Sequence, residues 1–448
     1  MTTQTPTEET PATATLDEAL AYALELQQQL RLDGAQLIYE RILEVAPEHP
    51  DVLHFLGVLM HQRGRVDEAI ALIARAIALI PDHVPCHINM GNVLAESGRL
   101  DEAVAEYLRA LSLVPDQADV HNNLGVLHKL QRKWLEAESY YRRAIEIDPK
   151  HVSAYNNMGL LFAAQGKIKE AVEYYCRSIA EMPGNPDSRR LLGIAYYTLG
   201  RTAEAAEVFR QWLEESPEDP VAKHMHAACS GKDVPVRAAD DYIEHTFDRF
   251  ADSFEAQLQQ RLEYKAPEIV AEALQSALQA SSAQLDILDA GCGTGLCGPL
   301  LKPFARHMIG VDLSAGMLAK AEAKQCYDLL EKAELTAYIA ARQAAFDAIV
   351  SADTIVYFGA LDEVLHASHA AMRKGGLLIF TVEKGEGKVP EDIGFAINPH
   401  GRYAHTQTYL RGSLTKAGLS VDAINEVVLR NEGGEPVIGW VVTARKSA

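Results

Sequence analysis

Four kinds of residue recur every 34 positions through the first half of the chain: a glycine, an alanine, a large residue four positions after the alanine, and a proline. A unit repeated in this way can bury its apolar face only against its neighbours, so the segment is predicted to stack into a solenoid. In that order, the positions are Gly57, Gly91, Gly125, Gly159 and Gly193; Ala69, Ala103, Ala137, Ala171 and Ala205; Ile73, Tyr107, Tyr141, Tyr175 and Phe209; and Pro81, Pro115, Pro149, Pro183 and Pro217.

The 34-residue unit resembles the tetratricopeptide repeat (TPR). Small residues are expected where the two helices of a unit cross closely, large residues fill the gap beside them, and proline ends the second helix. A sixth, degenerate unit at the front keeps Ala35, Tyr39 and Pro47. The resemblance implies an α-solenoid of six repeats over residues 16–230, with a concave groove and a closing helix within Val221 to Ser230.

An asparagine also recurs at this interval, at Asn89, Asn123 and Asn157. A similar asparagine ladder in repeat proteins of the O-GlcNAc-transferase kind grips peptide backbone, because an amide both donates and accepts hydrogen bonds. The alternative is that these side chains bond to neighbouring helix ends or to water. Both interpretations stay open, and the first predicts a protein or peptide partner in the groove.

The second half is organised around a glycine-rich turn after an apolar run, Leu285 to Gly298 (LDILDAGCGTGLCG). Such a turn lets backbone N–H groups approach a ligand near the start of a helix. The last six residues also match the dinucleotide pattern G-x-G-x-x-G. Its first glycine should close the strand, but here Gly291 does so, which shifts the frame by two residues.

The turn resembles motif I (D-x-G-x-G-x-G) of class I S-adenosylmethionine-dependent methyltransferases. The run DLSAGML, starting at Asp312, resembles the family's next motif, in which the acid accepts the ribose hydroxyls and Met317 packs on adenine. Glu334 stands where the family has an acid facing the adenine amine, and the segment around Tyr242 and Phe250 resembles its cofactor lid. The implied cofactor-binding residues are Asp289, Gly291, Cys292, Gly293, Gly295, Asp312, Leu313, Met317, Glu334, Tyr242 and Phe250.

The resemblance implies a Rossmann-like, seven-stranded domain. Strands are expected at 285–290, before Asp312, within 329–339, before Asp353 and at 375–383. The last two runs should form an antiparallel hairpin, the ending of class I methyltransferases, whereas a nicotinamide enzyme would continue in βα units. The predicted organisation is a disordered tail at 1–15, the repeats at 16–230, a linker at 231–240 and the methyltransferase domain at 241–448.

Five side chains are candidates to face the transferred methyl group: Asp353, Tyr357, Glu383, Tyr403 and His405. Methyl transfer from a sulfonium requires mainly that the reacting atoms be held in line, and a base is needed only if the acceptor arrives protonated. The catalytic candidates retained are Asp353, Tyr357 and His405. For His405 a structural role is the stronger alternative, because no partner for it can be identified from the sequence.

The composition restricts which molecules the protein is expected to bind and in which cellular compartment it is expected to function. The net charge of −20 disfavours non-specific binding to nucleic acid or to an anionic membrane. The six scattered cysteines have no metal-ligand or disulfide spacing, so no metal is expected and a reduced, cytoplasmic compartment fits. No apolar run is long enough to span a membrane, and the first 15 residues lack the features of a signal peptide.

The domain order resembles that of bacterial proteins described as predicted methyltransferases containing TPR repeats. The leading hypothesis is methylation of a protein or carrier-bound acceptor docked by the repeat groove, with S-adenosylmethionine converted to S-adenosylhomocysteine. The alternatives are a small-molecule methyltransferase that uses its repeats for assembly, and a scaffold that binds the cofactor without turnover. The methyl acceptor and the oligomeric state stay open.

Overall fold

The computed structural model of the 448-residue chain describes residues 15–251, 254–255, 264–278, 284–385, 387, 389, 392–432 and 435–447, with the side chain of Phe250 excepted. The chain divides into two compact units, Met1–Pro183 and Gly184–Ala448. No helix within the described ranges has both the length and the apolar character needed to cross a membrane.

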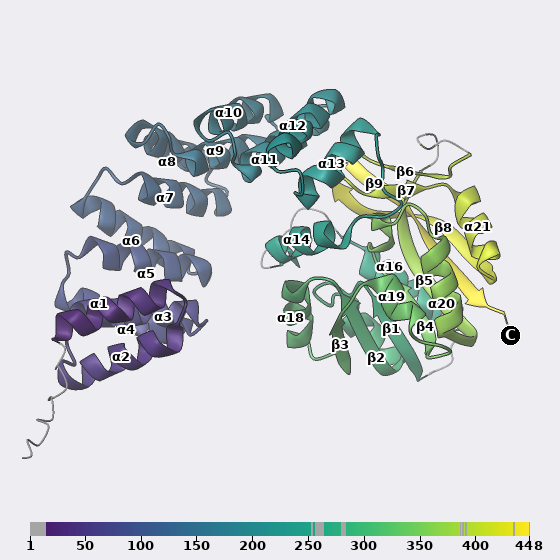
Figure 1. Ribbon diagram of the computed structural model, residues 1–448, viewed down its shortest axis with the longest axis horizontal. Helices are drawn as coiled ribbons and strands as arrows, with labels where there is room; N and C mark the ends of the chain where they lie inside the picture. Colours follow the sequence, from purple (N-terminus) through teal and green to yellow (C-terminus); the bar gives the residue numbers. More distant parts are fainter. Residues whose placement is uncertain are drawn as a thin grey trace, which may run out of the picture. The chain divides into compact units, whose positions relative to one another are not determined.

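The first unit consists of consecutive helix pairs, drawn in purple to blue-teal in Figure 1. Its second helices end two residues before the recurring prolines, as α4 does before Pro81 and α6 before Pro115, which confirms the predicted helix ends. The helices are α1 (Leu16–Gln28), α2 (Leu32–Val45), α3 (Pro50–Gln62), α4 (Val66–Leu79), α5 (Val84–Glu96), α6 (Leu100–Leu113), α7 (Ala118–Leu130), α8 (Trp134–Ile147), α9 (Val152–Ala164) and α10 (Ile168–Glu181).

The recurring glycines lie where the two helices of a pair cross. A Cβ atom added to Gly125 would lie 2.5 Å from the Cε1 atom of Tyr141, and one added to Gly159 would lie 2.3 Å from that of Tyr175. Both tyrosines are almost fully buried. The 34-residue period therefore records a close helix crossing in which an aromatic ring fills the space that a side chain would occupy.

The second unit starts with three more helices, α11 (Pro186–Thr198), α12 (Thr202–Glu215) and α13 (Pro220–Ser230). They are the sixth repeat and the expected closing helix. His224 of α13 stacks on Tyr242 with ring centroids 3.8 Å apart, and its Nε2 atom lies 2.7 Å from the carbonyl oxygen of Gly401. The sixth repeat thus packs as part of the same compact unit as the sheet that follows it.

A nine-stranded sheet forms the centre of the second unit among the described residues (Figure 1). Its order is β3-β2-β1-β4-β5-β7-β6; β9 pairs antiparallel with β5, and β8 with β9. The strands are β1 (Leu285–Ala290), β2 (Ala305–Asp312), β3 (Leu329–Lys332), β4 (Phe346–Ser351), β5 (Met372–Lys384), β6 (Phe395–Ile397), β7 (Tyr403–His405), β8 (Leu419–Glu432) and β9 (Glu435–Lys446).

Both faces of the sheet are covered, as expected for parallel strands. Ile287 packs in an apolar cluster with residues of α16, whereas its neighbour Leu288 belongs to the cluster on the other face with residues of α20 and α21. The helices of this domain are α14 (Asp240–Phe250), α16 (Ala266–Ala277), α17 (Gly298–Leu301), α18 (Ala315–Ala323), α19 (Leu335–Ala340), α20 (Asp362–Ala371) and α21 (Gln407–Lys416), with 3-10 turns η1 (Lys302–Phe304) and η2 (Ile355–Tyr357).

The predicted Rossmann-like class and terminal hairpin are confirmed. The structure adds the short strands β6 and β7 to the seven that were expected. The third strand, β3, lies within its predicted range and ends at Lys332, and α19 begins at Leu335. The order reverses between β1 and β4, so the carboxyl ends of these two strands flank the crevice where ligands bind in open α/β sheets.

Candidate functional site

The glycine turn follows β1 with three residues in the left-handed region: Gly291 (φ 77°), Gly293 (φ 53°) and Gly295 (φ 81°). A Cβ atom on Gly291 would lie 2.2 Å from Thr354, and one on Gly295 would lie 3.0 Å from Tyr327. A Cβ atom on Gly293 would meet nothing within 4 Å. The outer two glycines therefore permit packing, while the middle one leaves space for a ligand.

This space belongs to a cavity, here named the glycine-turn cavity, which encloses about 950 Å³ of empty volume including its open mouth. Gly291, Cys292 and Gly293 form one wall of the cavity. From the end of β2 and from α18 come Asp312, Leu313 and Met317, and Glu334 follows β3. The structure thus brings seven of the predicted cofactor-binding residues to one cavity.

Asp312 is bonded to the turn that it faces. Its Oδ2 atom accepts a hydrogen bond from the Gly293 N–H at 2.9 Å, and its Oδ1 atom accepts one from the Ser314 N–H at 2.9 Å. Burial raises the pKa of this carboxyl, and these backbone donors partly offset the rise. The acid after β2 is therefore held in a fixed orientation at the cavity wall.

Two of the predicted acids have structural partners. Asp289 is fully buried and does not line the cavity; its Oδ2 atom accepts from the Tyr327 hydroxyl at 2.6 Å, and burial raises its pKa to about 7. Glu334 does line the cavity, but its carboxylate caps α19, accepting from the N–H groups of Thr336 and Ala337. This capping role explains why a glutamate fits at the position.

The expected lid corresponds to α14, but different residues face the cavity. Ile243 and Phe247, one turn apart, line the glycine-turn cavity, and Phe254 follows them. Tyr242 faces away, because it is buried against His224. The side chain of Phe250 lies outside the described residues. The helical spacing of Ile243 and Phe247, one turn apart, is the sequence signal for this face of α14.

Asp353 follows β4 at the edge where the sheet order reverses. Its backbone has φ 54°, uncommon for a residue other than glycine and typical of constrained positions. Its Oδ2 atom accepts from Nη1 of Arg430 at 2.6 Å, while its buried Oδ1 atom has no hydrogen-bond partner among the described residues. Burial raises the pKa of Asp353, and Arg430 partly offsets the rise.

A second cavity, here named the repeat-side cavity, lies within the same compact unit. Arg190, Ile194 and Tyr197 of α11 line it, with Trp212 of α12 and Met225 of α13. The sheet domain contributes residues from α14, η2, β8 and the segment before β7. The walls of this cavity therefore come from the sixth repeat, the closing helix and the sheet domain together.

The two cavities meet. Five residues line both cavities and are here named the shared wall: Phe247, Phe254, Tyr264, Asp353 and Tyr357. Phe247 and Tyr357 contact each other edge to face, with ring centroids 5.6 Å apart. The candidates Asp353 and Tyr357 therefore line both cavities.

The remaining three candidates do not line either cavity. His405 is fully buried, its Nε2 atom lies 3.0 Å from the Gly359 carbonyl oxygen, and burial lowers its pKa to about 4. Tyr403 donates to the Pro235 carbonyl at 2.6 Å. Burial would raise the pKa of Glu383, but Arg402, His400 and Arg430 lower it to about 2. These side chains stabilise the fold around the site.

Two arginines that sequence reasoning missed connect Asp353 to two further acids. Arg430 bonds to Asp353, Glu383 and Glu432, and Arg402 bonds to Glu383 and Glu432, both at 2.7 Å. Both arginines line the repeat-side cavity. Nothing in the sequence pattern indicated them, because Arg430 comes to Asp353 from the terminal hairpin, 77 positions away.

The recurring asparagines in the first unit bond to neighbouring side chains. Nδ2 of Asn89 lies 2.8 Å from His54 Nε2, and Nδ2 of Asn157 donates to Oδ1 of Asn122 at 2.9 Å, each 35 positions back. Asn123 is 3.5 Å from the Tyr107 hydroxyl. All three recurring asparagines stay half-buried. The asparagines thus bond to side chains of the preceding repeat, and their binding of peptide backbone stays a prediction.

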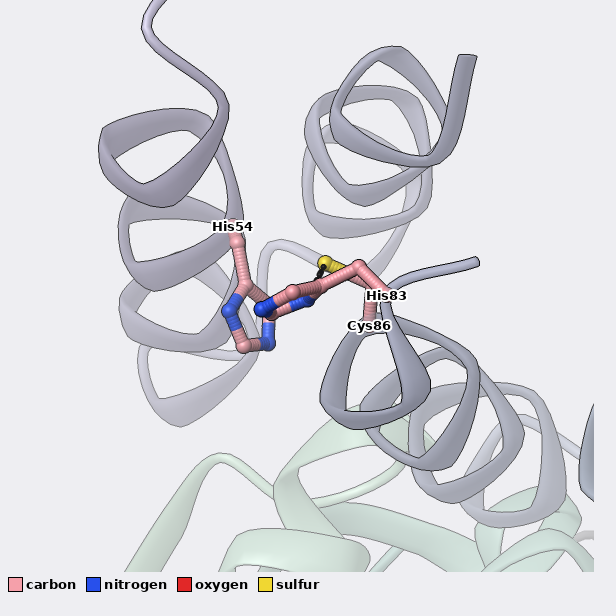
Figure 2. A group of neighbouring side chains, drawn as sticks. All are labelled: His54, His83 and Cys86. Atoms are coloured by element: carbon pink, nitrogen blue, oxygen red, sulfur yellow. Dashed lines mark hydrogen bonds between the residues drawn. The ribbon is translucent and has the colours of Figure 1, made fainter. Parts of the chain in front are cut away.

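Among the described residues, His54, His83 and Cys86 could hold a metal ion by proximity, with one ligand atom from each within 4.8 Å of the others. Figure 2 shows the three side chains close together, with a hydrogen bond between His83 and Cys86. The Nδ1 atom of His83 lies 3.0 Å from the Cys86 sulfur. His54 already bonds to Asn89, and burial lowers its pKa to about 4. These side chains form two separate hydrogen-bonded pairs, His54 with Asn89 and His83 with Cys86.

Comparison with known proteins matches both parts of the chain. Families described as TPR repeat or tetratricopeptide repeat match residues 20–84, 91–131, 116–180 and 156–220, and a family described as methyltransferase domain matches residues 258–424. The crystal structure of PilW, a widely conserved type IV pilus biogenesis factor, aligns at 19% identity with a TM-score of 0.43, covering 47% of this chain and 98% of that one.

Two curated relatives match shorter stretches. Malonyl-[acyl-carrier protein] O-methyltransferase of Enterobacter lignolyticus is 33% identical over 95 residues, or 21% of this chain. Methyltransferase-like protein 27 of Homo sapiens is 37% identical over 87 residues, or 19% of this chain. The chain spans only 38% and 35% of the lengths of these relatives.

Proposed function

The chain joins tetratricopeptide repeats in its N-terminal region to a methyltransferase domain at its C-terminal end, and from this premise we propose that it transfers a methyl group from S-adenosylmethionine to an acceptor carried by a protein. The observation that carries the proposal is the shared wall of the two cavities. A donor in the glycine-turn cavity and an acceptor in the repeat-side cavity would meet at Asp353 and Tyr357.

The residues of the glycine-turn cavity fit S-adenosylmethionine. Gly293 leaves open space over the turn, Asp312 offers a carboxylate to the ribose hydroxyls, and Met317 offers an apolar surface to adenine. Ile243 and Phe247 of α14 would cover the bound cofactor. When bound, the cofactor supplies an activated methyl group on a sulfonium, so the protein needs mainly to hold the reacting atoms in line and to exclude water.

The contribution of the sixth repeat to the cavity wall favours an acceptor that is carried by a larger molecule. Tyr197 and Trp212 belong to helices of the repeat array, yet they line the cavity that reaches Asp353. An acceptor on a protein or carrier held by the repeats would enter beside these side chains. One relative is named for an acceptor borne by a carrier protein, malonyl-[acyl-carrier protein], and for methyl transfer to oxygen.

Two measurements test the proposal. Isothermal titration of the full-length protein should give micromolar binding of S-adenosylhomocysteine, and no such binding would contradict the proposed cofactor. Incubation of a cell lysate with the protein and tritiated S-adenosylmethionine should label macromolecules. Label found only in the organic-soluble fraction would point instead to a small-molecule acceptor, with the repeats used for assembly.

A further inference from the structure

The chemistry of the repeat-side cavity restricts the acceptor, and three features carry the argument. The first is its aromatic lining. Tyr197 and Trp212 come from the sixth repeat, Phe247 from α14 and Tyr357 from η2. The faces of aromatic rings attract cations, especially where water is excluded. The path from the repeats to Asp353 is therefore suited to a ligand with a positively charged head and an apolar stem.

The second feature is the net charge of the ion-paired group that includes Asp353. Arg402 and Arg430 face three carboxylates, those of Asp353, Glu383 and Glu432, so the group has one negative charge in excess. Nearby His400 adds no charge at neutral pH, because burial lowers its pKa to about 4. Arg190 and Arg249 also line the cavity and share the single carboxylate of Asp187. The negative excess is therefore confined to the group around Asp353, where a carboxylate acceptor would meet arginines that already have anionic partners.

The third feature is the Oδ1 atom of Asp353. It is buried without a hydrogen-bond partner among the described residues, although Asp353 lines both cavities. A buried acceptor atom left unpaired is costly, so a ligand that donates a hydrogen bond there is favoured. Glu383 and Glu432 cannot take this role, because each is bonded to both arginines.

Resting on the proposed methyl transfer, we propose that the acceptor is an amine, such as a lysine side chain or the amino terminus of a protein, which enters the repeat-side cavity as an ammonium ion and gives a proton to Asp353. The aromatic lining would hold the charged stem, and the Oδ1 atom of Asp353 would accept the N–H hydrogen bond. Arg430 would position Asp353 through its other oxygen.

The step balances without another reactant. The amine loses one proton to the Asp353 carboxylate, and the freed lone pair on nitrogen forms the bond to the methyl carbon. The carbon–sulfur bond breaks as this bond forms, and the sulfur keeps its electron pair, which gives S-adenosylhomocysteine. Asp353 returns its proton to water. An acceptor that arrives without a proton, such as a carboxylate, would have no use for this base.

The chemical stability of the transferred label tests the acceptor class. Macromolecules labelled by the full-length protein and tritiated S-adenosylmethionine are treated with mild alkali and then hydrolysed in acid. Label that survives alkali and is recovered as methylated lysine or a methylated amino terminus supports the proposal. Release of volatile methanol identifies a carboxyl ester and overturns the amine class while leaving methyl transfer intact.

Binding of matched probes provides a test that needs no acceptor. The full-length protein, saturated with S-adenosylhomocysteine, is titrated with cyclohexylammonium and with cyclohexanecarboxylate, which share a ring and differ in charge. At least tenfold tighter binding of the ammonium is expected; equal or tighter binding of the carboxylate overturns the proposal. Failure to saturate with S-adenosylhomocysteine would instead count against the proposed cofactor.

Two variants locate the effect. Asp353→Asn keeps the shape of the side chain and should weaken cyclohexylammonium binding at least tenfold. Asp422→Asn removes an exposed carboxylate that pairs with Arg445, outside both cavities, and should change nothing. Unchanged ammonium binding in Asp353→Asn overturns the assigned role. If Asp353→Asn does not fold, the comparison of the two probes on the unaltered protein still decides the acceptor class.

Discussion

Arg430 donates from Nη1 to the Oδ2 atom of Asp353 over 2.6 Å and leaves the other oxygen of that carboxylate without a partner among the described residues. The same guanidinium also bonds to Glu383 and Glu432. One buried cation thus joins three acids from three different strand ends or loops. Its removal would leave those acids short of a compensating charge.

Arg430→Leu is therefore expected to lower the free energy of unfolding by about 3–5 kcal/mol, as removal of one partner from a buried ion pair does. Arg306→Leu is the matched control, because Arg306 pairs with Asp286 through a half-exposed side chain and should cost at most about 1 kcal/mol. Urea unfolding of both variants measures the difference. Equal losses would show that the Arg430 group contributes no more than a surface pair.

Gly293→Ala should weaken cofactor binding without a special cost to folding. The added methyl group would enter the open space of the glycine-turn cavity. Gly375→Ala is the control, since Gly375 also has a positive φ and would also meet nothing within 4 Å. Each substitution should cost about 1–2 kcal/mol of stability from its backbone conformation alone. Only Gly293→Ala should raise the Kd for S-adenosylhomocysteine, by roughly tenfold, or 1.4 kcal/mol.

Asp289 should make the protein less stable as pH rises from about 4 to 7. Its pKa in the folded protein is about 7, against about 3.9 in an unfolded chain. The folded state therefore holds the proton more tightly, and its stability falls as pH rises through this window, by up to about 4 kcal/mol. Asp289→Asn should remove the slope, which thermal unfolding at several pH values would reveal. A slope that persists in the variant would assign it to other groups.

The close helix crossing at Gly125 should resist any larger residue. Gly125→Ala puts a methyl group about where the Tyr141 ring lies and should cost about 1–3 kcal/mol by overpacking. Gly125→Ala combined with Tyr141→Leu should cost less than the two single changes added together, because the smaller side chain makes room. A double-mutant cycle in urea gives this coupling. Additive losses would mean that the two side chains do not compete for the same space.

The compact unit Gly184–Ala448 predicts where the chain can be cut. A fragment of residues 184–448 should fold and bind S-adenosylhomocysteine like the full chain. A fragment of residues 231–448 lacks His224 and the rest of α13, which cover Tyr242, and should unfold at a lower temperature or aggregate. Equal Tm values for the two fragments would support the boundary at 230 that the repeat pattern suggests.

The repeats and the strands could be predicted because each depends on the spacing of residue types over a short stretch of sequence. The period places Gly125 opposite Tyr141, and the apolar run that ends at Ala290 places Gly291 at the start of the turn. Asp312 ends β2 and Met317 lies in the first turn of α18, so both reach the cavity from the same strand-to-helix connection. In all these cases, the residues lie within one supersecondary unit, where short-range geometry decides the outcome.

The remaining features depend on contacts between distant segments. Tyr242 turns away from the glycine-turn cavity because His224 of the closing helix offers it a stacking partner. Glu334 lines the cavity, but its carboxylate caps the N-terminus of α19. This role could not be predicted without knowing that a helix begins at Leu335. The link from Asp353 to Arg430 needs the terminal hairpin in place. No spacing rule connects positions so far apart.

The compact unit that begins at Gly184 includes the sixth repeat. Arg190, Tyr197 and Trp212 of this repeat line the repeat-side cavity. Under the proposed function, the first five repeats could be exchanged for others, as interchangeable adaptors, and the chain would meet new partners while keeping its chemical preference. The sixth repeat could not be exchanged in this way, since its side chains form part of the reaction chamber itself.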